Sequence, residues 1–290
     1  MFYQSIRIQI AIITKLINNT KFKIDKGDHL LDTHTHILWN IDDGSKNQCM
    51  SLQMLEIAAR SGTKAIFATP HVIERANKPS WEEIKEKTQQ LRQLCAEAQI
   101  DIMLYPGAEV QMNWELLPEL GATGAYCLNG GRYLLIELPA AEIPAYADEF
   151  WYELELKGIT PILAHPERYQ QLRENPDLLL LWRRRGMLMQ CNSGSFTGMF
   201  GSSVCENAKV LLANGLVDLL GSDGHRSEGR NTDMSRAAAV IRQLAGEEVL
   251  RQLTETNPQA ILKNQEIELK QPKVLLEDKP KSFWQKLFCK

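Results

Sequence analysis

Short apolar runs alternate with longer amphipathic segments from about Leu30 onward, and this alternation restricts the fold more than any other feature of the chain. Each apolar run has the length of a short buried strand, and each longer segment has the spacing of a helix with one apolar face. About seven such repeats predict a βα-repeating fold. The apolar runs cover residues 30–32, 65–68, 102–105, 134–136, 161–164, 187–189 and 217–220.

Six segments between the runs are predicted to be helices. Four of them are followed by glycine (Gly62, Gly158, Gly186 and Gly215), the residue that most often ends a helix on its C-terminal side. The predicted helices cover residues 47–60, 81–98, 145–157, 176–185, 203–214 and 233–245.

A barrel accommodates these repeats better than an open sheet. No Gly-x-Gly-x-x-Gly or phosphate-binding loop opens a predicted helix, so the chain lacks the fingerprint of the open nucleotide-binding sheets. We therefore predict an α/β fold, a distorted (β/α)7 TIM-like barrel. Six runs are expected to be parallel strands. The run 134–136 follows the turn signal Asn129-Gly130-Gly131 and is expected to form a hairpin with residues 125–128.

No linker or low-complexity segment interrupts the repeats, so residues 30–265 are expected to form a single domain. An N-terminal extension (residues 1–29) precedes it and a C-terminal tail (residues 266–290) follows it. The end of the tail mixes lysine with large apolar side chains, which suits a helix near a membrane surface or a segment that packs on its own domain or on a partner, including another copy of the chain. Those apolar residues are Phe283, Trp284, Leu287 and Phe288.

Charge and targeting signals exclude several classes of protein. With 33 Lys and Arg against 36 Asp and Glu, the net charge is −3, so no nucleic-acid partner is expected. The apolar run from Ile8 to Ile17 is broken by Lys15 and is followed by no small-residue cleavage site, which argues against secretion or a membrane span. The six cysteines form no Cys-x-x-Cys pair, and a cytoplasmic location is expected.

Ionisable residues gather directly after the apolar runs. The first run leads into His34-Thr35-His36, and side chains two apart on an extended strand point to the same side, so both imidazoles can face one metal ion. A His-x-His pair alone can equally be a polar strand end. Five of the six histidines lie at such run ends, however, and only His29 does not. Together they favour a metal site.

The C-terminal ends of barrel strands form one rim, where the active sites of such barrels lie. The candidate ligands at this rim are imidazole nitrogens and carboxylate oxygens without a thiolate, which favours manganese, iron or zinc. Five imidazoles and four carboxylates exceed what one ion needs, so two or three bridged ions are expected. The candidate ligands are His34, His36, Asp43, His71, Glu109, Glu137, His165, Asp223 and His225.

Three arginines follow candidate ligands closely: Arg168 follows His165, and Arg226 and Arg230 follow His225. A guanidinium group suits phosphate oxygens because it presents a planar fork of donors. Each arginine can instead form a surface ion pair, which contributes little to stability. Arg168 is favoured for anion binding because it lies beside a candidate ligand, and Arg230 and then Arg226 come next.

Taken in order, these motifs resemble those of the bacterial PHP-type (polymerase and histidinol phosphatase) protein tyrosine phosphatases, which act on the tyrosine kinases of capsule and exopolysaccharide synthesis. The resemblance extends from about Leu31 to Asn264. The motifs that carry it are His34-Thr35-His36, Ile41-Asp42-Asp43-Gly44-Ser45, Ala68-Thr69-Pro70-His71, Pro106-Gly107-Ala108-Glu109-Val110, Ile136-Glu137-Leu138-Pro139, Ala164-His165-Pro166-Glu167-Arg168 and Ser222-Asp223-Gly224-His225.

The resemblance implies a distorted barrel of the PHP type with a site for three metal ions, often manganese, with iron, zinc or cobalt as alternatives. It also implies that a metal-activated hydroxide attacks phosphorus while Arg168 and Arg230 stabilise the phosphoryl oxygens. The implied ligand sets are His34, His36, Glu109 and Asp223 for one ion, Glu109, Glu137 and His165 for a second, and Asp43, His71 and His225 for a third.

The substrate implied by the resemblance is phosphotyrosine on a bacterial tyrosine kinase. No Cys-x5-Arg motif occurs, which argues against a cysteine nucleophile. Two alternatives stay open: a phosphatase of a small phosphomonoester such as histidinol phosphate, and a non-catalytic assembly factor of polysaccharide export. The chain departs from the family pattern at Gly224, where alanine is expected, and in the greater length of its N-terminal extension.

Overall fold

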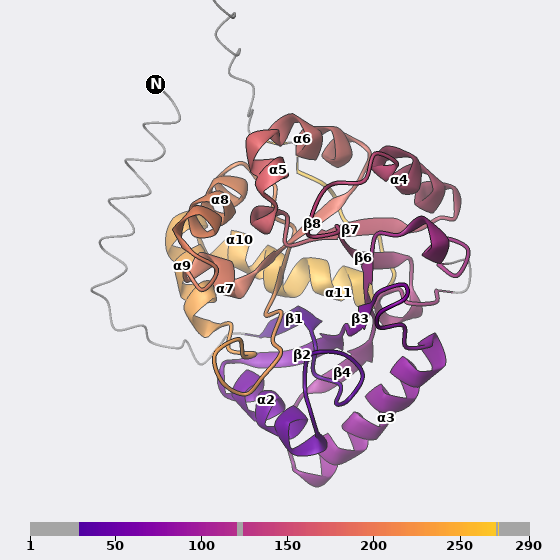
Figure 1. The fold of residues 1–290 in the computed structure, drawn as a ribbon. Coiled ribbons are helices and arrows are strands. Elements are labelled where there is room, and N and C mark those ends of the chain that lie inside the picture. The colour runs from indigo at the N-terminus through magenta and orange to yellow at the C-terminus, as the bar shows by residue number, and fades with distance from the viewer. Residues whose placement is uncertain (1–28, 121–123, 271, 273–290) are drawn as a thin grey trace, which may run out of the picture.

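The computed structural model describes residues 29–120, 124–270 and residue 272 (Figure 1). The predictions about the N-terminal extension, apart from His29, and about the aromatic residues of the tail therefore lie outside the described residues. Within the described part, no helix is both long enough and apolar enough to span a bilayer.

Parallel strands form a curled sheet in the middle of the fold (Figure 1). The strands are β1 (Leu30–Thr35), β2 (Thr63–Ala68), β3 (His71–Val72), β4 (Met103–Pro106), β5 (Glu109–Gln111), β6 (Tyr133–Glu137), β7 (Thr160–Ala164), β8 (Leu188–Asn192) and β9 (Leu219–Gly221). Three of them pair in the order β1-β2-β4, and six pair in the order β3-β5-β6-β7-β8-β9. A parallel bridge between Thr35 and Gly224 brings the end of β1 against the segment that follows β9.

The predicted hairpin is wrong, because β6 lies between β5 and β7 and is parallel to both. Residues 125–128 form a turn and the start of the short 3₁₀ helix η2 (Leu128–Gly130) rather than a strand. The turn signal itself is real, since Asn129 has a positive φ of 54°. The side chains of β6 from Tyr133 to Ile136 are buried, which is typical of a parallel strand covered on both faces.

All six predicted helices are present, with ends that differ from the prediction by at most two residues. Local signals explain their starts and ends: Asn47 accepts a hydrogen bond from the Met50 N–H, and Ser80 accepts one from the Glu83 N–H. The four glycines that follow helices all have positive φ. The six helices are α2 (Gln48–Arg60), α3 (Trp81–Glu97), α4 (Ala147–Leu156), α6 (Pro176–Arg184), α8 (Ser202–Ala213) and α9 (Ser235–Ala245).

The structure adds short helices that the sequence analysis did not predict. They are η1 (Trp114–Leu116), η3 (Pro166–Arg168), α5 (Gln170–Glu174), α7 (Ser193–Phe196), α10 (Glu247–Arg251), the π-helical turn η4 (Gln252–Thr256) and α11 (Asn257–Leu262). The last three form a nearly continuous C-terminal run, and α11 lies in the middle of the view in Figure 1.

The apolar core has two parts. The larger part lies between the sheet and the helices around it and includes Trp151 and Trp182. The smaller part is an inner cluster to which successive strands contribute side chains, and Ile261 of α11 and Ile267 complete it. Ile267, which lies in the predicted tail, is therefore buried against this cluster, and Leu269 packs against it in part. The strand residues of the inner cluster are Phe67, Tyr133, Leu135, Ile162, Ala164, Leu188 and Leu219.

Candidate metal centre

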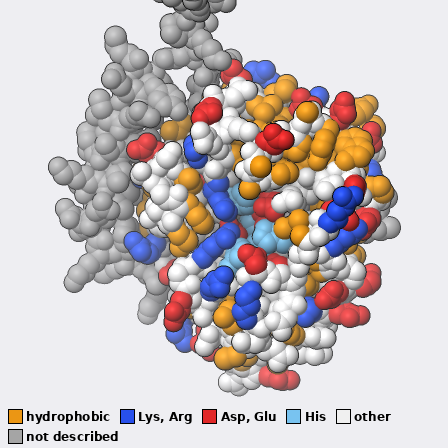
Figure 2. All heavy atoms as spheres, in the orientation of Figure 1, with side chains coloured by type: hydrophobic (Ala, Val, Ile, Leu, Met, Phe, Trp, Pro, Cys, Tyr) orange, Lys and Arg blue, Asp and Glu red, His pale blue; other side chains and the backbone are white. Residues whose placement is uncertain are grey.

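The C-terminal ends of the strands bring the candidate ligands together. Histidines occupy the ends of β1 and β7 and the start of β3, carboxylates lie in β5 and at the end of β6, and a further pair follows β9. Figure 2 shows the histidines at the bottom of a hollow, with Lys and Arg side chains along one side of it. This placement agrees with the rim expected for a βα fold.

One group consists of four fully buried side chains, namely His34, His36, Glu109 and Asp223. The Nε2 atoms of His34 and His36 are 3.1 Å apart. His34 Nε2 lies 3.0 Å from Glu109 Oε2, and His36 Nε2 lies 3.3 Å from Asp223 Oδ1. Two nitrogens and two oxygens thus converge on one point, in the same combination that the resemblance implies.

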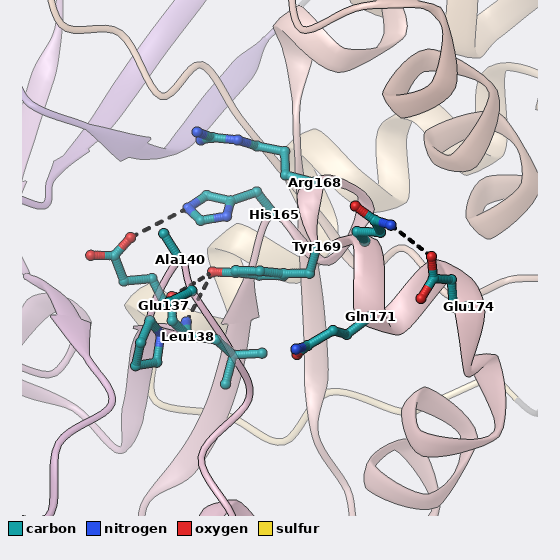
Figure 3. A pocket seen from close by; sticks show the side chains of 11 residues that line it. Glu137, Leu138, Ala140, His165, Arg168, Tyr169, Gln171 and Glu174 are labelled. Atoms are coloured by element: carbon teal, nitrogen blue, oxygen red, sulfur yellow. Dashed lines mark hydrogen bonds and ion pairs between the residues drawn. The ribbon is translucent and has the colours of Figure 1, made fainter.

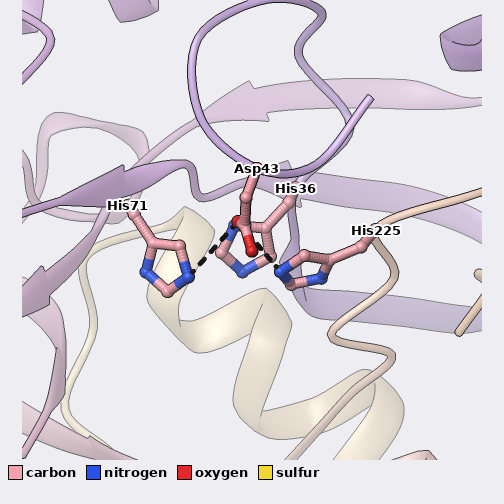
Figure 4. Close-up of side chains that lie close together, drawn as sticks. All are labelled: His36, Asp43, His71 and His225. Atoms are coloured by element: carbon pink, nitrogen blue, oxygen red, sulfur yellow. Dashed lines mark ion pairs between the residues drawn. The ribbon is translucent and has the colours of Figure 1, made fainter. Parts of the chain in front are cut away.

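A second group lies nearer the surface and contains His36, Asp43, His71 and His225 (Figure 4). Asp43 Oδ1 lies 3.3 Å from His225 Nε2 and 3.7 Å from His71 Nε2. The Asp43 side chain is 65% exposed whereas that of His225 is 3% exposed. This group therefore has one open side, and it differs from the implied set by including His36.

A third group joins His71, Glu109 and Glu137, with His71 Nδ1 at 3.2 Å from Glu109 Oε2 and 3.4 Å from Glu137 Oε1. The resemblance implies His165 at this position. His165 Nε2 does lie close, 2.8 Å from Glu109 Oε1 and 4.0 Å from Glu137 Oε2. His36, His71 and Glu109 each take part in two groups, so the three groups share ligands.

The buried atoms of these groups fit divalent cations. Glu109 Oε2, Asp223 Oδ1, His71 Nδ1 and His225 Nε2 are buried without a hydrogen-bond partner among the described residues. Buried polar atoms are rarely left without partners, and each of these four lies within 4 Å of another candidate ligand atom, as His71 Nδ1 does at 3.2 Å from Glu109 Oε2. Nitrogen and oxygen donors without thiolate suit manganese, iron or zinc.

Electrostatics within the groups hold the carboxylates ionised. Burial alone would raise the pKa of Glu109 and of Asp223, but the neighbouring imidazoles, chiefly His34, keep both pKa values well below the usual range. Burial alone would lower the pKa of His34, and the carboxylates of Glu109 and Asp223 raise it instead. The pKa of His225, by contrast, falls to about 4 through burial and the nearby His36, so His225 is neutral at pH 7.

Two of the three candidate arginines reach the centre. Arg168 Nη1 donates to Asp223 Oδ2 at 3.1 Å, and Arg230 Nη2 forms an ion pair with the same oxygen. Both guanidinium groups lie over the ring of Phe200, at 4.8 and 5.6 Å from its centroid. Arg226 differs, because its side chain is exposed and its backbone N–H donates to the Arg230 carbonyl.

Comparison with known proteins places this site in a family. A family model described as "Capsular polysaccharide synthesis, CpsB/CapC" matches residues 30–263. The chain belongs to the CpsB/CapC family. This confirms the resemblance found from the sequence motifs.

Relatives of this CpsB/CapC protein carry the name tyrosine-protein phosphatase. YwqE of Bacillus subtilis (strain 168) is 34% identical over 238 residues, which cover 82% of this chain and 93% of YwqE. CpsB of Streptococcus pneumoniae is 28% identical over 241 residues, which cover 81% of this chain and 99% of CpsB.

Solved structures agree with these matches. A structure from work on YwqE and CpsB, described as unique metal-dependent tyrosine phosphatases, matches with a TM-score of 0.80 and 33% identity, over 86% of this chain and 100% of that one. The phosphotriesterase homology protein of Escherichia coli matches with a TM-score of 0.53 and 11% identity, over 79% and 97% of the two chains. The second match shows a similar fold only.

Residues that the sequence analysis missed orient the histidines of this CpsB/CapC site. His34 Nδ1 lies 2.9 Å from Gln190 Oε1, and His36 Nδ1 lies 2.7 Å from Asp42 Oδ2, so each Nε2 faces the centre. Asp42 lies next to the candidate ligand Asp43, within the motif Ile41-Asp42-Asp43-Gly44-Ser45. Gln190 follows the run 187–189, the one apolar run that ends without an ionisable side chain. Nothing in the sequence around Gln190 therefore marked it as part of a metal site.

The backbone near the centre adopts conformations that are uncommon for residues with side chains. His165 and Asp223 have positive φ values of 37° and 53°, and such strained residues often lie at functional sites. Gly224 has a packing reason, because a Cβ there would lie 2.7 Å from Thr232 Cγ2. The departure from the expected alanine therefore reflects a close approach to the segment around Thr232.

A pocket of about 530 Å³ opens beside the centre (Figure 3). Three of its lining residues, Glu137, His165 and Arg168, also belong to the centre described above. The others are Leu138, Pro139, Ala140, Ala141, Tyr169, Gln170, Gln171 and Glu174.

Proposed function

We propose that this chain is a metal-dependent protein-tyrosine phosphatase that hydrolyses phosphotyrosine on a bacterial tyrosine kinase and so regulates capsular or exopolysaccharide synthesis. One observation carries the proposal: shared groups of imidazoles and carboxylates lie directly beside two arginines that bind the same carboxylate. The names of the CpsB/CapC relatives support phosphotyrosine as the substrate. A non-catalytic role is disfavoured because every candidate ligand is present and converges on the site.

The proposed cofactor is Mn²⁺, in two or three ions. Bound metal ions would generate a nucleophile from water at neutral pH and neutralise charge on the phosphoryl group. His34, His36, Glu109 and Asp223 would hold one ion. Two further sets share His71: one adds His36, Asp43 and His225, and the other adds Glu109 and Glu137, with His165 beside Glu109.

The chain's own residues would bind the phosphoryl group and favour the transition state. Arg168 and Arg230 now bond to Asp223 Oδ2, and their remaining N–H groups can donate to the equatorial phosphoryl oxygens, where charge develops. The leaving group is a tyrosinate, whose conjugate acid has a pKa of about 10, so it departs without a strong general acid. Arg226, whose side chain is exposed, is proposed to contact substrate only at the rim.

The fold and the location form part of the proposal. β2 continues into β3 and β4 continues into β5 after short interruptions, so the described strands can be counted as the seven positions of a (β/α)7 barrel around the inner cluster. The family match over residues 30–263 supports a single phosphatase domain. Free cysteines among the described residues fit a reducing compartment, the cytoplasm.

Metal removal tests the proposal directly. Chelator treatment should abolish phosphate release from a phosphotyrosyl peptide, and Mn²⁺ should restore it, with metal analysis of the purified protein run in parallel. Turnover that resists complete metal removal would contradict the mechanism. Faster hydrolysis of histidinol phosphate than of the peptide would instead favour a small phosphomonoester as the substrate.

A further inference from the structure

Helix α4 presents an exposed face that combines apolar and acidic side chains. Tyr152 and Leu156, one helical turn apart, are 53% and 64% exposed. Residues 147–156 contain four Asp or Glu residues and no Lys or Arg, and three of these acidic side chains share the exposed side of the helix with Tyr152 and Leu156. Figure 2 shows hydrophobic side chains gathered over α4. The α4 face consists of Asp148, Glu149, Tyr152, Glu155 and Leu156.

Two neighbours of α4 each add an exposed apolar side chain. Trp114 is 43% exposed, and its ring lies 5.8 Å from that of Tyr146, the residue before α4. Leu181 of α6 is 40% exposed, and α6 is joined to α4 by a 2.9 Å hydrogen bond from Trp182 Nε1 to Asp148 Oδ1. Large apolar side chains that are exposed in one region, with charged side chains around them, mark interaction sites.

The described part of the chain ends beside the same two helices. The Lys270 carbonyl oxygen accepts a 3.2 Å hydrogen bond from Arg183 Nη2 of α6. Arg185 of α6 donates to the Asp148 carbonyl oxygen of α4, also at 3.2 Å, so α6 contacts both the end of the described chain and α4. A helix with its side chains is about 10–12 Å wide, whereas the ten residues 273–282 can span up to about 33–36 Å. The residues after Ser282 can therefore reach the α4 face.

The sequence of the C-terminal segment is complementary to the α4 face. Residues 279–290 include four lysines and no acidic residue. Ser282 and Gln285 have the spacing of a capping box, which favours the start of a helix. The large apolar residues of the segment are spaced so that they share one side of such a helix, and they are Phe283, Trp284, Leu287 and Phe288. A basic amphipathic segment thus follows an acidic, partly apolar surface in the same chain.

We propose that residues 282–290 dock on the α4 face of the same molecule, with their apolar side chains against Tyr152 and Leu156 and their lysines beside the acidic residues. Attachment through ten residues favours this occupant over a separate partner, because a tether gives the segment a high effective concentration at α4. Docking covers apolar side chains on both surfaces, which stabilises the contact. The inference concerns a surface outside the metal centre and is independent of the proposed function.

Limited proteolysis of the full-length protein by chymotrypsin, which cleaves after Phe283 and Trp284, tests the docking. Because only the undocked population is cleaved, we expect cleavage in the protein to be at least about tenfold slower than in a synthetic peptide of residues 273–290. Leu156→Glu should raise the rate in the protein roughly tenfold, since burial of one leucine shifts an equilibrium by about that factor. Met103→Glu is the matched control, because Met103 is 57% exposed on β4 and lies outside the α4 face.

Charge reversal on the two surfaces gives a second measurement. Glu149→Lys together with Glu155→Lys should raise the cleavage rate severalfold, because the face would then repel the lysines of the segment. Adding Lys286→Glu and Lys290→Glu to that variant should restore protection, since the charges on the two surfaces again attract. Glu86→Lys is the control, because Glu86 is exposed on α3. Failure of the combined variant to regain protection would contradict the charge pairing.

Other results would overturn the docking proposal. Cleavage of the unaltered protein at the rate of the peptide would mean that the segment is not docked, and protection that Leu156→Glu leaves unchanged would mean that it docks elsewhere. Protection that falls on dilution would show that a second copy of the chain holds the segment. Protection that arises only with vesicles of anionic phospholipid would show that a membrane surface holds it instead.

Discussion

Asp223 is the residue at which the two halves of the site meet. One of its oxygens faces His34 and His36, while the other accepts from Arg168 and Arg230. A single carboxylate thus couples the candidate metal ligands to the candidate phosphate-binding arginines. Loss of one metal ligand should therefore disturb both metal binding and the position of the phosphate-binding arginines.

His36→Ala should lower phosphotyrosyl-peptide hydrolysis by more than about 100-fold, because His36 takes part in two of the three ligand groups and even supporting residues of metal sites cost about 10–100-fold. Circular dichroism should show that the fold survives. His29→Ala is the control, since His29 is exposed and lies outside the site. Near-native turnover of His36→Ala would remove His36 from the site.

Phe200 is half-buried, and both arginines lie over its ring. Phe200→Leu should lower kcat/KM by about 5- to 30-fold, because two cation–π contacts contribute roughly 0.5–1 kcal/mol each. Phe200→Tyr should keep kcat/KM close to that of the unaltered protein, since tyrosine also presents an aromatic face to the arginines. Met199→Leu, at a neighbouring side chain that is 48% exposed, serves as the control, and an equal loss in it would contradict a specific role for the ring.

The sequence predicted the metal-centre residues better than their surroundings. Histidines are rare, so their recurrence after apolar runs was informative, and the side chains do converge. Gln190 and Phe200 were missed because a glutamine or a phenylalanine carries no comparable signal on its own. Their roles depend on contacts between segments far apart in the chain, such as His34 with Gln190.

At the scale of elements, local signals predicted helices and tertiary contacts decided the rest. Capping residues and glycines fixed the helix ends, whereas the pairing of β6 depended on its two neighbouring strands. The run α10-η4-α11 was missed because its apolar side chains fill the spaces left by other elements, as Ile261 does. Such a role cannot be derived from a local pattern.

A buried ion pair joins α6 to β8, β9 and the last described segment. Arg183 forms an ion pair with Asp218 and donates to the Lys270 carbonyl, while Asp218 also accepts the Met189 N–H. Asp218→Ala should lower the free energy of unfolding by about 3–5 kcal/mol, because it leaves a buried guanidinium without its partner. Urea denaturation measures this loss.

The control for this prediction is an exposed ion pair. Lys64 and Asp101 are 3.0 Å apart, with side chains 42% and 93% exposed. Asp101→Ala should therefore change the free energy of unfolding by less than about 1 kcal/mol. A similar change in Asp218→Ala and Asp101→Ala would show that burial does not set the strength of the Arg183 pair.

At the scale of the whole molecule, metal binding should depend on pH. The pKa values of His34, His36 and His71 are raised, against the effect of burial, by neighbouring carboxylates, so the metal-free protein holds protons on these imidazoles near neutral pH. A metal must displace them. Mn²⁺ affinity should therefore rise with pH until the pH exceeds these raised pKa values.

The same shifts fix how the stability of the metal-free protein depends on pH. Groups with a raised folded-state pKa stabilise fully below their unfolded pKa, about 6.5 for histidine, and this contribution is lost as pH rises through the folded values. Isothermal titration of Mn²⁺ into the metal-free protein, in buffers of different ionisation enthalpy, measures the protons that metal binding releases from these histidines. Binding without proton release at pH 7 would show that the histidines are neutral before the metal arrives.

The inner cluster has a consequence for how the chain is made. Ile261 and Ile267 complete a cluster whose other members, apart from Leu128 of η2, lie on strands synthesised much earlier, beginning with Phe67. A ribosome releases the chain from its N-terminal end, so the strands emerge while their apolar inner faces still lack a cover, and exposed apolar surface promotes aggregation. Polypeptides that terminate before Ile261 should accumulate as chaperone substrates instead of native enzyme.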